Sequence, residues 1–433
     1  MPVFLDASAP GFEAGFTALL DAKREDSADV EAAVMAIIDD VRARGDAALI
    51  SLTAKFDRLD LTPETLRISM AEMDGLIAQV PSEERAALEQ AATRIRAYHE
   101  RQLPADESWT DDSGATLGWR WTAIGAAGLY VPGGLASYPS SVLMNAIPAR
   151  VAGVDRLAIA VPTPDGRAGP LVMLAARLAG VDEIYRVGGA QAIAALAYGT
   201  ETIAPVDKIT GPGNAYVAAA KRRVFGRVGI DMIAGPSEIL VIADGDNDPD
   251  WIALDLLSQA EHDESAQAIL ITDSAALARD VAAAVDKRLE TLARRTIAGA
   301  SWRDFGAIIT VPDLDTAAGL ADRIAPEHLE LMVADPEALA ARIRHAGAIF
   351  LGAWTPEAIG DYVGGPNHVL PTARSARFSS GLSVMDFLKR TTLARMSPES
   401  LRATGPAAET LARAESLEAH GLSVRARLDR LNG

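Results

Sequence analysis

The chain has 433 residues, of which 49% are hydrophobic, and its formal net charge is −18 at pH 7. So acidic a chain, with only 5% aromatic residues, lacks the basic surface and stacking side chains that bind nucleic acid. Because no cysteine occurs, disulfides, thiolate nucleophiles and sulfur-ligated metals are excluded. No stretch approaches the roughly 18 apolar residues of a membrane helix, and the first residues lack the pattern of a signal peptide. We therefore expect a soluble cytoplasmic α/β protein without nucleic-acid or membrane partners.

Helical patterns dominate the first hundred residues. We expect one helix around 11–23 and a second from Ala28 to Arg44, where Gly45 suits a C-terminal stop. Another helix begins at Ser82 and continues to about residue 102. Residues 103–122 are polar and contain glycine, which predicts a hairpin with 117–121 as one strand.

From residue 123 short apolar runs alternate with alanine-rich helices. The expected strands are 127–131, 157–161 and 183–187, and the expected helices are 141–152, 169–178 and 190–198. The pattern repeats after Gly235-Pro236, with strands at 239–243, 268–272, 307–310, 329–333 and 348–351 and helices at 250–261, 275–291, 316–324 and 337–345. This alternation predicts parallel strands joined by helices.

The predicted fold class is α/β, with two Rossmann-like domains built on parallel-rich sheets and small helical segments at both ends. Residues 1–28 form an N-terminal helical segment. Residues 29–128 and 237–381 form the first domain, and residues 129–236 form the second. Residues 382–433 form a helical tail, with Pro406 and Gly421 bracketing one helix, and such a tail packs on another domain or on a second subunit.

The predicted helix 250–261 carries a candidate metal-binding pair. Asp248 is a good N-cap and Pro249 suits the first helical position. Leu254 and Leu257 are expected to face the core. Gln259 and His262 are three residues apart, so they emerge on one helical face with Cβ atoms roughly 5–6 Å apart. A carboxamide oxygen and an imidazole at that spacing can hold one metal ion, although a histidine at a helix end is more often structural.

Four of the six histidines lie in unusual contexts. His99 and His345 sit in amphipathic helices and are interpreted as structural. The other four are His262, His328 at the start of a strand, His368 in a glycine-rich loop after Asp361, and His420 at the end of the tail helix. Glu327-His328 places an acid beside an imidazole, which can supply a general base and a group that orients water. A salt-bridged surface pair is the structural alternative.

Two glycine turns lie where a strand or loop meets a helix, at residues 187–191 and 210–214. Backbone N–H groups at such junctions can bind anions. Neither turn matches a dinucleotide fingerprint or a P-loop, so the turns alone specify no nucleotide.

A set of short motifs, each modest alone, is highly specific in combination. The motifs are Gly128–Gly134, Gly188–Ile193, Gly211–Val217, Ala234–Glu238, Leu257–His262, Ala325–Glu330, Gly360–Tyr362, Asn367–Thr372 and Glu418–His420. Together and in this order the motifs resemble the histidinol dehydrogenase family, from about residue 28 to the C-terminus.

This resemblance implies a zinc- and NAD-dependent enzyme of histidine biosynthesis. The family oxidises L-histidinol to L-histidine with two NAD⁺, through an aldehyde that stays bound, in the last step of the pathway. One zinc ion per subunit is implied, with ligands at the matching positions Gln259, His262, Asp361 and His420. The tail that carries His420 is exchanged in the family, so a homodimer with shared active sites is expected.

The resemblance also implies roles for other residues. His328 takes the alcohol proton, and Glu327 activates the water that hydrates the aldehyde. Glu415 holds the substrate ammonium. The full set expected to contact the substrate is Ser237, Gln259, His262, His328, Asp361, His368, Glu415 and His420, and the set expected to contact NAD is Tyr130, Gln191 and Asn214.

Other functions fit parts of the pattern. A paralogous zinc- and NAD-dependent dehydrogenase acting on another polar alcohol, such as a sulfonated diol, would share the fold, but Glu415 and His420 favour a substrate with an amine and an imidazole. A zinc hydrolase would also use a Glu-His pair, although no His-Glu-x-x-His motif is present. A binding or scaffold role explains none of the clustering.

Overall fold

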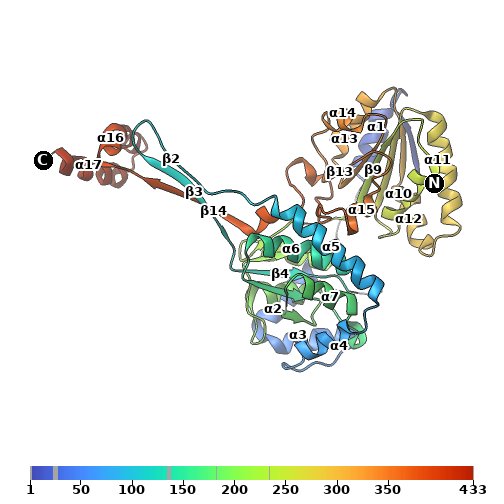
Figure 1. Ribbon diagram of the computed structural model, residues 1–433, viewed down its shortest axis with the longest axis horizontal. Coiled ribbons are helices and arrows are strands. Elements are labelled where there is room, and N and C mark those ends of the chain that lie inside the picture. The colour runs from blue at the N-terminus through green and yellow to red at the C-terminus, as the bar shows by residue number, and fades with distance from the viewer. Residues whose placement is uncertain (1, 23–27, 134–137, 182, 234, 433) are drawn as a thin grey trace. The chain divides into compact units, whose positions relative to one another are not determined.

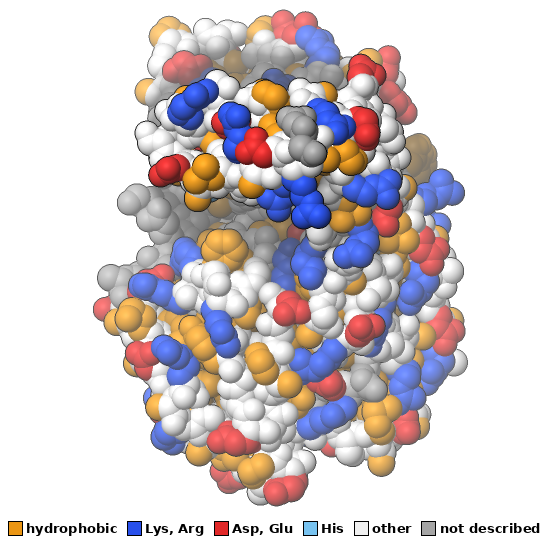
Figure 2. Space-filling view, turned by 90° about the vertical axis from the view of Figure 1, so that its left-hand side faces the viewer, with side chains coloured by type: hydrophobic (Ala, Val, Ile, Leu, Met, Phe, Trp, Pro, Cys, Tyr) orange, Lys and Arg blue, Asp and Glu red, His pale blue; other side chains and the backbone are white. Residues whose placement is uncertain are grey.

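The computed structural model describes residues 2–22, 28–133, 138–181, 183–233 and 235–432. Residues 1 and 23–27 of the expected N-terminal segment, and the motif residues Gly134 and Ala234, lie outside the described residues. The chain divides into two compact units, which are Met1–Arg101 with Gly125–Phe387 and Gln102–Ile124 with Leu388–Gly433. Among the described helices, none is long and apolar enough to cross a membrane. Figure 2 shows acidic and basic side chains interspersed on one face of the molecule.

A six-stranded parallel sheet forms one core of the first unit. Its strand order is β1-β11-β10-β9-β12-β13. The strands are β1 (Val3–Asp6), β9 (Glu238–Ala243), β10 (Gln267–Thr272), β11 (Ala307–Thr310), β12 (His328–Met332) and β13 (Ala348–Leu351). The α/β fold class with parallel sheets is confirmed.

Helices cover both faces of this sheet, because alternate residues of each strand point to opposite sides. Leu240 and Ile242 of β9 pack with α1 (Phe12–Leu20), α13 (Leu314–Ile324) and α14 (Pro336–Ala340). Ile239 and Val241 pack on the other face with α10 (Pro249–Ala260), α11 (Ala275–Leu289) and α12 (Arg295–Phe305). Figure 1 shows α13 and α10 on opposite sides of β9. Helix α15 (Glu357–Tyr362) follows β13.

A five-stranded parallel sheet forms the second core of this unit, in the order β6-β5-β4-β7-β8. The strands are β4 (Ala126–Tyr130), β5 (Arg156–Ala160), β6 (Glu183–Tyr185), β7 (Lys208–Thr210) and β8 (Gly229–Ile230). One group of helices shares a buried apolar cluster with the strands: α2 (Ala28–Arg44), α3 (Asp46–Asp57), α8 (Gly189–Tyr198) and α9 (Ala215–Val224). A second group packs together: α4 (Met70–Ile77), α5 (Ser82–Glu100), α6 (Pro139–Ala152) and α7 (Pro170–Leu178).

The elements group differently from the expected domains in two places. Residues 3–6 are not part of a separate helical segment, because β1 pairs with β11 and extends the six-stranded sheet. The helices in 29–101 do not complete that sheet. Instead, α2 packs on α8 and α9, which share a buried cluster with the five-stranded sheet. The backbone N–H of Ile68 also donates to the carbonyl of Ile184 at the edge strand β6, at 2.8 Å. The position of apolar side chains on a helix predicts that the helix is buried, but not which sheet buries it.

The second unit is a small antiparallel sheet followed by two helices. The sheet has the order β14-β3-β2, formed by β14 (Leu388–Arg395), β3 (Thr116–Ala123) and β2 (Glu107–Thr110). The hairpin expected in residues 103–122 is confirmed. The tail is not wholly helical, because it begins with strand β14. Helices α16 (Pro398–Ala414) and α17 (Glu418–Asn432) pack on each other. Pro406 lies within α16 and Gly421 lies within α17, so the expectation that they bracket one helix is wrong.

Candidate active site

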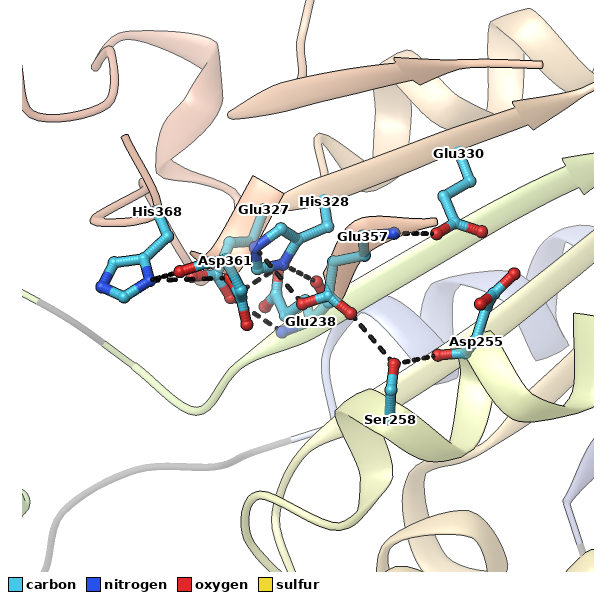
Figure 3. A network of polar contacts seen from close by, with 9 residues as sticks. All are labelled: Glu238, Asp255, Ser258, Glu327, His328, Glu330, Glu357, Asp361 and His368. Carbon is cyan, nitrogen blue, oxygen red and sulfur yellow. Dashed lines mark hydrogen bonds and ion pairs between the residues drawn. The ribbon is translucent and has the colours of Figure 1, made fainter. Parts of the chain in front are cut away.

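Polar side chains gather at the amino-terminal end of the six-stranded sheet (Figure 3). Glu238 is the first residue of β9 and His328 is the first residue of β12, and the parallel register of these neighbouring strands places His328 opposite Ile239. Helix α10 runs back along the sheet, so its last turn ends at the same edge. Asp248 is its N-cap, as expected, because the carboxylate accepts the N–H of Asp250 at 2.8 Å.

The imidazole of His328 is held by one defined hydrogen bond. Its Nδ1 lies 3.0 Å from the carbonyl oxygen of Glu238. Since a carbonyl only accepts, Nδ1 carries the hydrogen and Nε2 carries the lone pair in the neutral ring. Nε2 is buried without a hydrogen-bond partner among the described residues. This is the tautomer that a general base acting through Nε2 requires.

Glu327 lies beside this imidazole and is buried. Its Oε2 accepts the N–H of Glu238 at 2.9 Å and lies 3.7 Å from Nδ1 of His328. Burial raises the pKa of Glu327 to about 8, against the smaller lowering effect of His328. Because basicity rises with pKa, its carboxylate is a stronger base than an exposed glutamate.

Three further acidic residues belong to this site, and the sequence interpretation missed their role. Glu357 Oε1 lies 3.6 Å from Nε2 of His328 and has no hydrogen-bond partner among the described residues. Glu330 Oε1 accepts the N–H of Glu357 at 2.6 Å. Ser258 links α10 to this group by donating to Glu357 Oε2 at 3.1 Å. Burial raises the pKa of Glu330 and of Glu357 well above the usual range, and raises that of Asp255 to about 6.

A sequence signal for these acids was available. Glu330 interrupts the otherwise apolar run of β12, and Asp255 interrupts the apolar face of α10. A carboxylate among buried apolar residues is costly unless it has a proton or a partner. Such positions are therefore candidates for a functional site.

Asp361 and His368 contact each other. Nδ1 of His368 donates to the backbone carbonyl of Asp361 at 3.0 Å and lies 3.7 Å from its Oδ1. Asp361 belongs to the short helix α15. His262 keeps an exposed edge. Desolvation of its ring lowers the pKa of His262, and the nearby carboxylate of Asp361 acts in the opposite direction.

The donor atoms present suit a zinc ion. Gln259 is fully buried, yet both side-chain amide atoms lack a partner among the described residues. A buried amide without a partner is unfavourable, so a ligand for its oxygen would remove the cost. Among the described residues, His328, Glu357 and Asp361 form a group whose candidate ligand atoms lie within 4.8 Å of one another. Of the expected ligands only Asp361 belongs to that group. His262 lies near it, because Asp361 and His328 both act on the pKa of His262.

The residues expected to contact NAD lie on the five-stranded sheet. Tyr130 ends β4 and is buried, and its hydroxyl accepts the N–H of Gly189 at 3.0 Å. Gln191 is buried in the first turn of α8. Asn214 is exposed and caps α9, accepting the N–H groups of Tyr216 and Val217 at 3.1 and 3.2 Å. All three follow the carboxyl ends of parallel strands, where open α/β sheets bind their ligands.

Other expected residues are placed less directly. Ser237 is half-buried just before β9, and its backbone carbonyl accepts the N–H of Gln267 at 2.9 Å. Glu415 and His420 are exposed residues of the second unit. They do not share a helix, because Glu415 is the C-cap of α16 and His420 lies in the first turn of α17.

Leu254 was expected in the core but is 39% exposed, whereas Leu257 is buried.

Known proteins are similar to this chain along its whole length. A family model described as histidinol dehydrogenase matches residues 20–428. The chain is 79% identical to histidinol dehydrogenase of Ruegeria pomeroyi over 433 residues, covering 100% of both chains. The chain belongs to the histidinol dehydrogenase family. It is also 78% identical to histidinol dehydrogenase of Cereibacter sphaeroides, again covering 100% of both. The crystal structure of histidinol dehydrogenase from Elizabethkingia anophelis matches with a TM-score of 0.95 and 36% identity, covering 100% of this chain and 99% of that one.

Membership of the histidinol dehydrogenase family confirms the resemblance found in the sequence. Histidinol dehydrogenases are oxidoreductases of histidine biosynthesis that use Zn²⁺ and NAD. The oxygen and nitrogen donors around Gln259 and Asp361 are of the kind that zinc accepts. The two alternative functions weighed for this sequence, a dehydrogenase of another polar alcohol and a zinc hydrolase, have no support from these relatives.

The raised pKa values of the buried acids predict how the free energy of unfolding depends on pH. The folded protein holds protons on Asp255 and Glu330 more tightly than the unfolded chain does, because burial raises both pKa values. Their contribution to stability is therefore complete below the unfolded pKa of about 4. It is lost as the pH rises through the folded values, which begin at about 6 for Asp255. Glu330→Gln should make the free energy of unfolding fall less between pH 5 and pH 8. Urea unfolding at the two pH values measures this difference.

Glu264→Gln, in the exposed turn after α10, is the matched control. It should show the same decline in stability as the unaltered chain. An equally steep decline in Glu330→Gln would show that the buried pair does not hold the proton.

Proposed function

We propose that this protein oxidises L-histidinol to L-histidine with two NAD⁺, through L-histidinaldehyde that stays bound, in the last step of histidine biosynthesis. The observation that carries the proposal is the buried Glu327-His328 pair with the unpartnered Nε2 of His328. One imidazole and one adjacent carboxylate suit two successive oxidations, because the first removes a proton from an alcohol and the second also needs an activated water.

In the first oxidation, Nε2 of His328 takes the hydroxyl proton while hydride leaves the carbinol carbon for NAD⁺. The hydrogen bond from Nδ1 to Glu238 keeps the ring oriented. In the second oxidation, Glu327 removes a proton from the water that adds to the aldehyde, and its raised pKa favours that transfer. His328 gives the proton it took in the first oxidation to the aldehyde oxygen, so the hydrate forms and the imidazole is again free to act as a base. A second hydride then leaves for a second NAD⁺, and His328 again takes the hydroxyl proton.

Zinc would be held by Gln259, His262, Asp361 and His420, and it would bind the amine and imidazole of histidinol. The unpartnered amide of Gln259 supports this assignment. Ser237, His368 and Glu415 would complete the substrate pocket, with Glu415 facing the ammonium group. Tyr130, Gln191 and Asn214 would contact NAD.

A homodimer follows from the same proposal. His420 and Glu415 belong to a unit formed by residues 102–124 and 388–433, separate from the unit that carries the other site residues. We propose that each active site takes these two residues from the partner subunit. The cytoplasmic location expected from the sequence also stays a prediction.

The stoichiometry tests the reaction directly. Each histidinol consumed should yield two NADH and one histidine, since both oxidations occur before release. The measurement is absorbance of NADH against substrate loss, with histidine determined separately. A chelator should abolish turnover and added zinc should restore it. One NADH per histidinol, with free aldehyde accumulating, would contradict the proposed double oxidation.

The Glu327-His328 pair should divide the work between the two oxidations. His328→Asn should slow both by about 10²–10⁴-fold, because both need a proton removed by a base. Glu327→Gln should mainly slow the oxidation of the aldehyde, since only that half uses water. Supplying histidinaldehyde isolates the second half, with Glu264→Gln as the control. If Glu327→Gln oxidises the aldehyde at the normal rate, Glu327 does not activate the water.

Hybrid dimers test the shared site. His262→Asn and His420→Asn should each lose most zinc and most activity while staying folded, whereas His345→Asn, outside the site, should lose neither. In a hybrid of the two inactive chains, one site carries both changes and the other carries none. Random mixing makes roughly half the dimers hybrids, so activity should return to about a quarter of the unaltered level. Inactive mixtures that demonstrably contain hybrids would show that all the ligands come from a single chain.

A further inference from the structure

A buried ion pair contacts the loop 211–214, which leads into α9. Lys221 projects from α9, and Asp231 follows β8 at the end of the neighbouring strand. The two side chains are only 3% and 1% exposed and are paired with each other. Two charges removed from water are stabilised only when further polar groups satisfy their remaining bonding capacity. The polar groups that bond to Lys221 and Asp231 therefore show which part of the chain the ion pair holds in place.

Both charges bond to the backbone of one residue, Gly211. Oδ2 of Asp231 accepts the N–H of Gly211 at 2.8 Å. Nζ of Lys221 donates to the carbonyl oxygen of Gly211 at 3.0 Å. Charge-assisted hydrogen bonds are shorter and stronger than neutral ones. The acid, the amine and the glycine backbone therefore form a closed set of three contacts that fixes Gly211 on both sides.

Gly211 in turn lies against the backbone of Tyr130. Its φ of 113° belongs to the region that favours glycine, and a Cβ at this position would come within 2.1 Å of the Tyr130 carbonyl oxygen. Tyr130 continues the contact to α8, because its hydroxyl accepts the N–H of Gly189 at 3.0 Å. A shift of Gly211 would therefore move groups at the ends of both β4 and β7.

This position is the topological switch point of the five-stranded sheet. From β4 the sheet continues on one side to β5 and β6 and on the other side to β7 and β8. Open α/β sheets bind ligands in the crevice outside the carboxyl ends of the strands at such a point. Residues 211–214 lie there, and Asn214 at the end of the loop caps α9 through its side chain.

We propose that the Lys221–Asp231 ion pair is a positioning device for the dinucleotide site, which holds the loop 211–214 in the geometry that binds NAD. The inference rests on the proposed function, in which Tyr130 and Asn214 contact NAD. In this proposal neither Lys221 nor Asp231 contacts NAD. Both act through the backbone of Gly211.

A double substitution separates this role from stability. Removing one partner leaves a buried unpaired charge and is strongly destabilising, whereas replacing both by apolar residues of similar volume is often neutral. The double variant Lys221→Met with Asp231→Leu should therefore fold but lose both contacts to Gly211. We expect KM for NAD to rise about tenfold, which corresponds to the loss of roughly one hydrogen bond. The kcat at saturating NAD and the KM for histidinol should stay within about twofold.

A conservative variant and a control complete the experiment. Lys221→Met with Asp231→Asn keeps an amide oxygen that can accept the N–H of Gly211, so it should recover part of the affinity for NAD. The control removes the Arg156–Glu183 pair at the opposite, amino-terminal edge of the same sheet, at 2.9 Å. Arg156→Met with Glu183→Leu should leave KM for NAD unchanged. Direct titration with NAD, followed by protein fluorescence, gives the affinity independently of turnover.

The outcomes are distinguishable. Folded variants that bind NAD as tightly as the unaltered protein overturn the proposal, and so does an equal loss in the Arg156–Glu183 control. If the apolar double variant does not fold, the Lys221→Met with Asp231→Asn variant decides by the same titration. Failure of the unaltered protein to reduce NAD with histidinol would instead overturn the proposed function. The ion-pair proposal is tested only by the ratio of variant to unaltered affinity for NAD.

Discussion

The site depends on one contact between two neighbouring strands. The parallel register of β9 and β12 brings the carbonyl of Glu238 to within 3.0 Å of Nδ1 of His328. That bond selects the tautomer of His328 and leaves Nε2 for chemistry. The N–H of the same Glu238 holds the carboxylate of Glu327. A single residue at the start of a central strand therefore orients both members of the pair through its backbone, and among substitutions at that position only proline removes the N–H group.

The site also places several acids out of water. Glu327, Glu330 and Glu357 are all nearly inaccessible to solvent. Burial of this kind favours the neutral form of each acid, so Glu330 and Glu357 keep protons that exposed glutamates would release at neutral pH. The backbone N–H groups of Glu238 and Glu357 offset part of the cost. The same desolvation that weakens these acids makes Glu327 a stronger base, so the cost in stability and the gain in reactivity have one physical source.

Local patterns in the sequence predicted most of the elements. The alternation of apolar runs and helices gave the two parallel sheets, and Asp248 marked the start of α10 because an N-cap is a short-range interaction. Long-range choices were less accessible. Helix α2 has the same apolar periodicity whichever sheet it covers, and β1 is a four-residue strand that pairs with a strand some 300 positions later. For the site, the family motifs contain His328 and Asp361, which lie close together in the structure. Glu357 became visible only when its distances and burial were known, because it belongs to no matched motif.

The small antiparallel sheet has a consequence for how the chain is made. Strand β14 pairs along its whole length with β3, from Leu388 opposite Ala123 to Arg395 opposite Thr116. The two strands are separated by the entire intervening sequence, so their pairing closes a very long loop. A growing chain emerges from the ribosome with its N-terminal part first. Both parallel sheets can therefore assemble during synthesis while β3 still lacks its main partner. The unit that carries His420 can form only after Leu388–Arg395 has left the ribosome, which is later than every strand of the two parallel sheets. The exchange of that unit between subunits that we propose would therefore follow the assembly of both sheets.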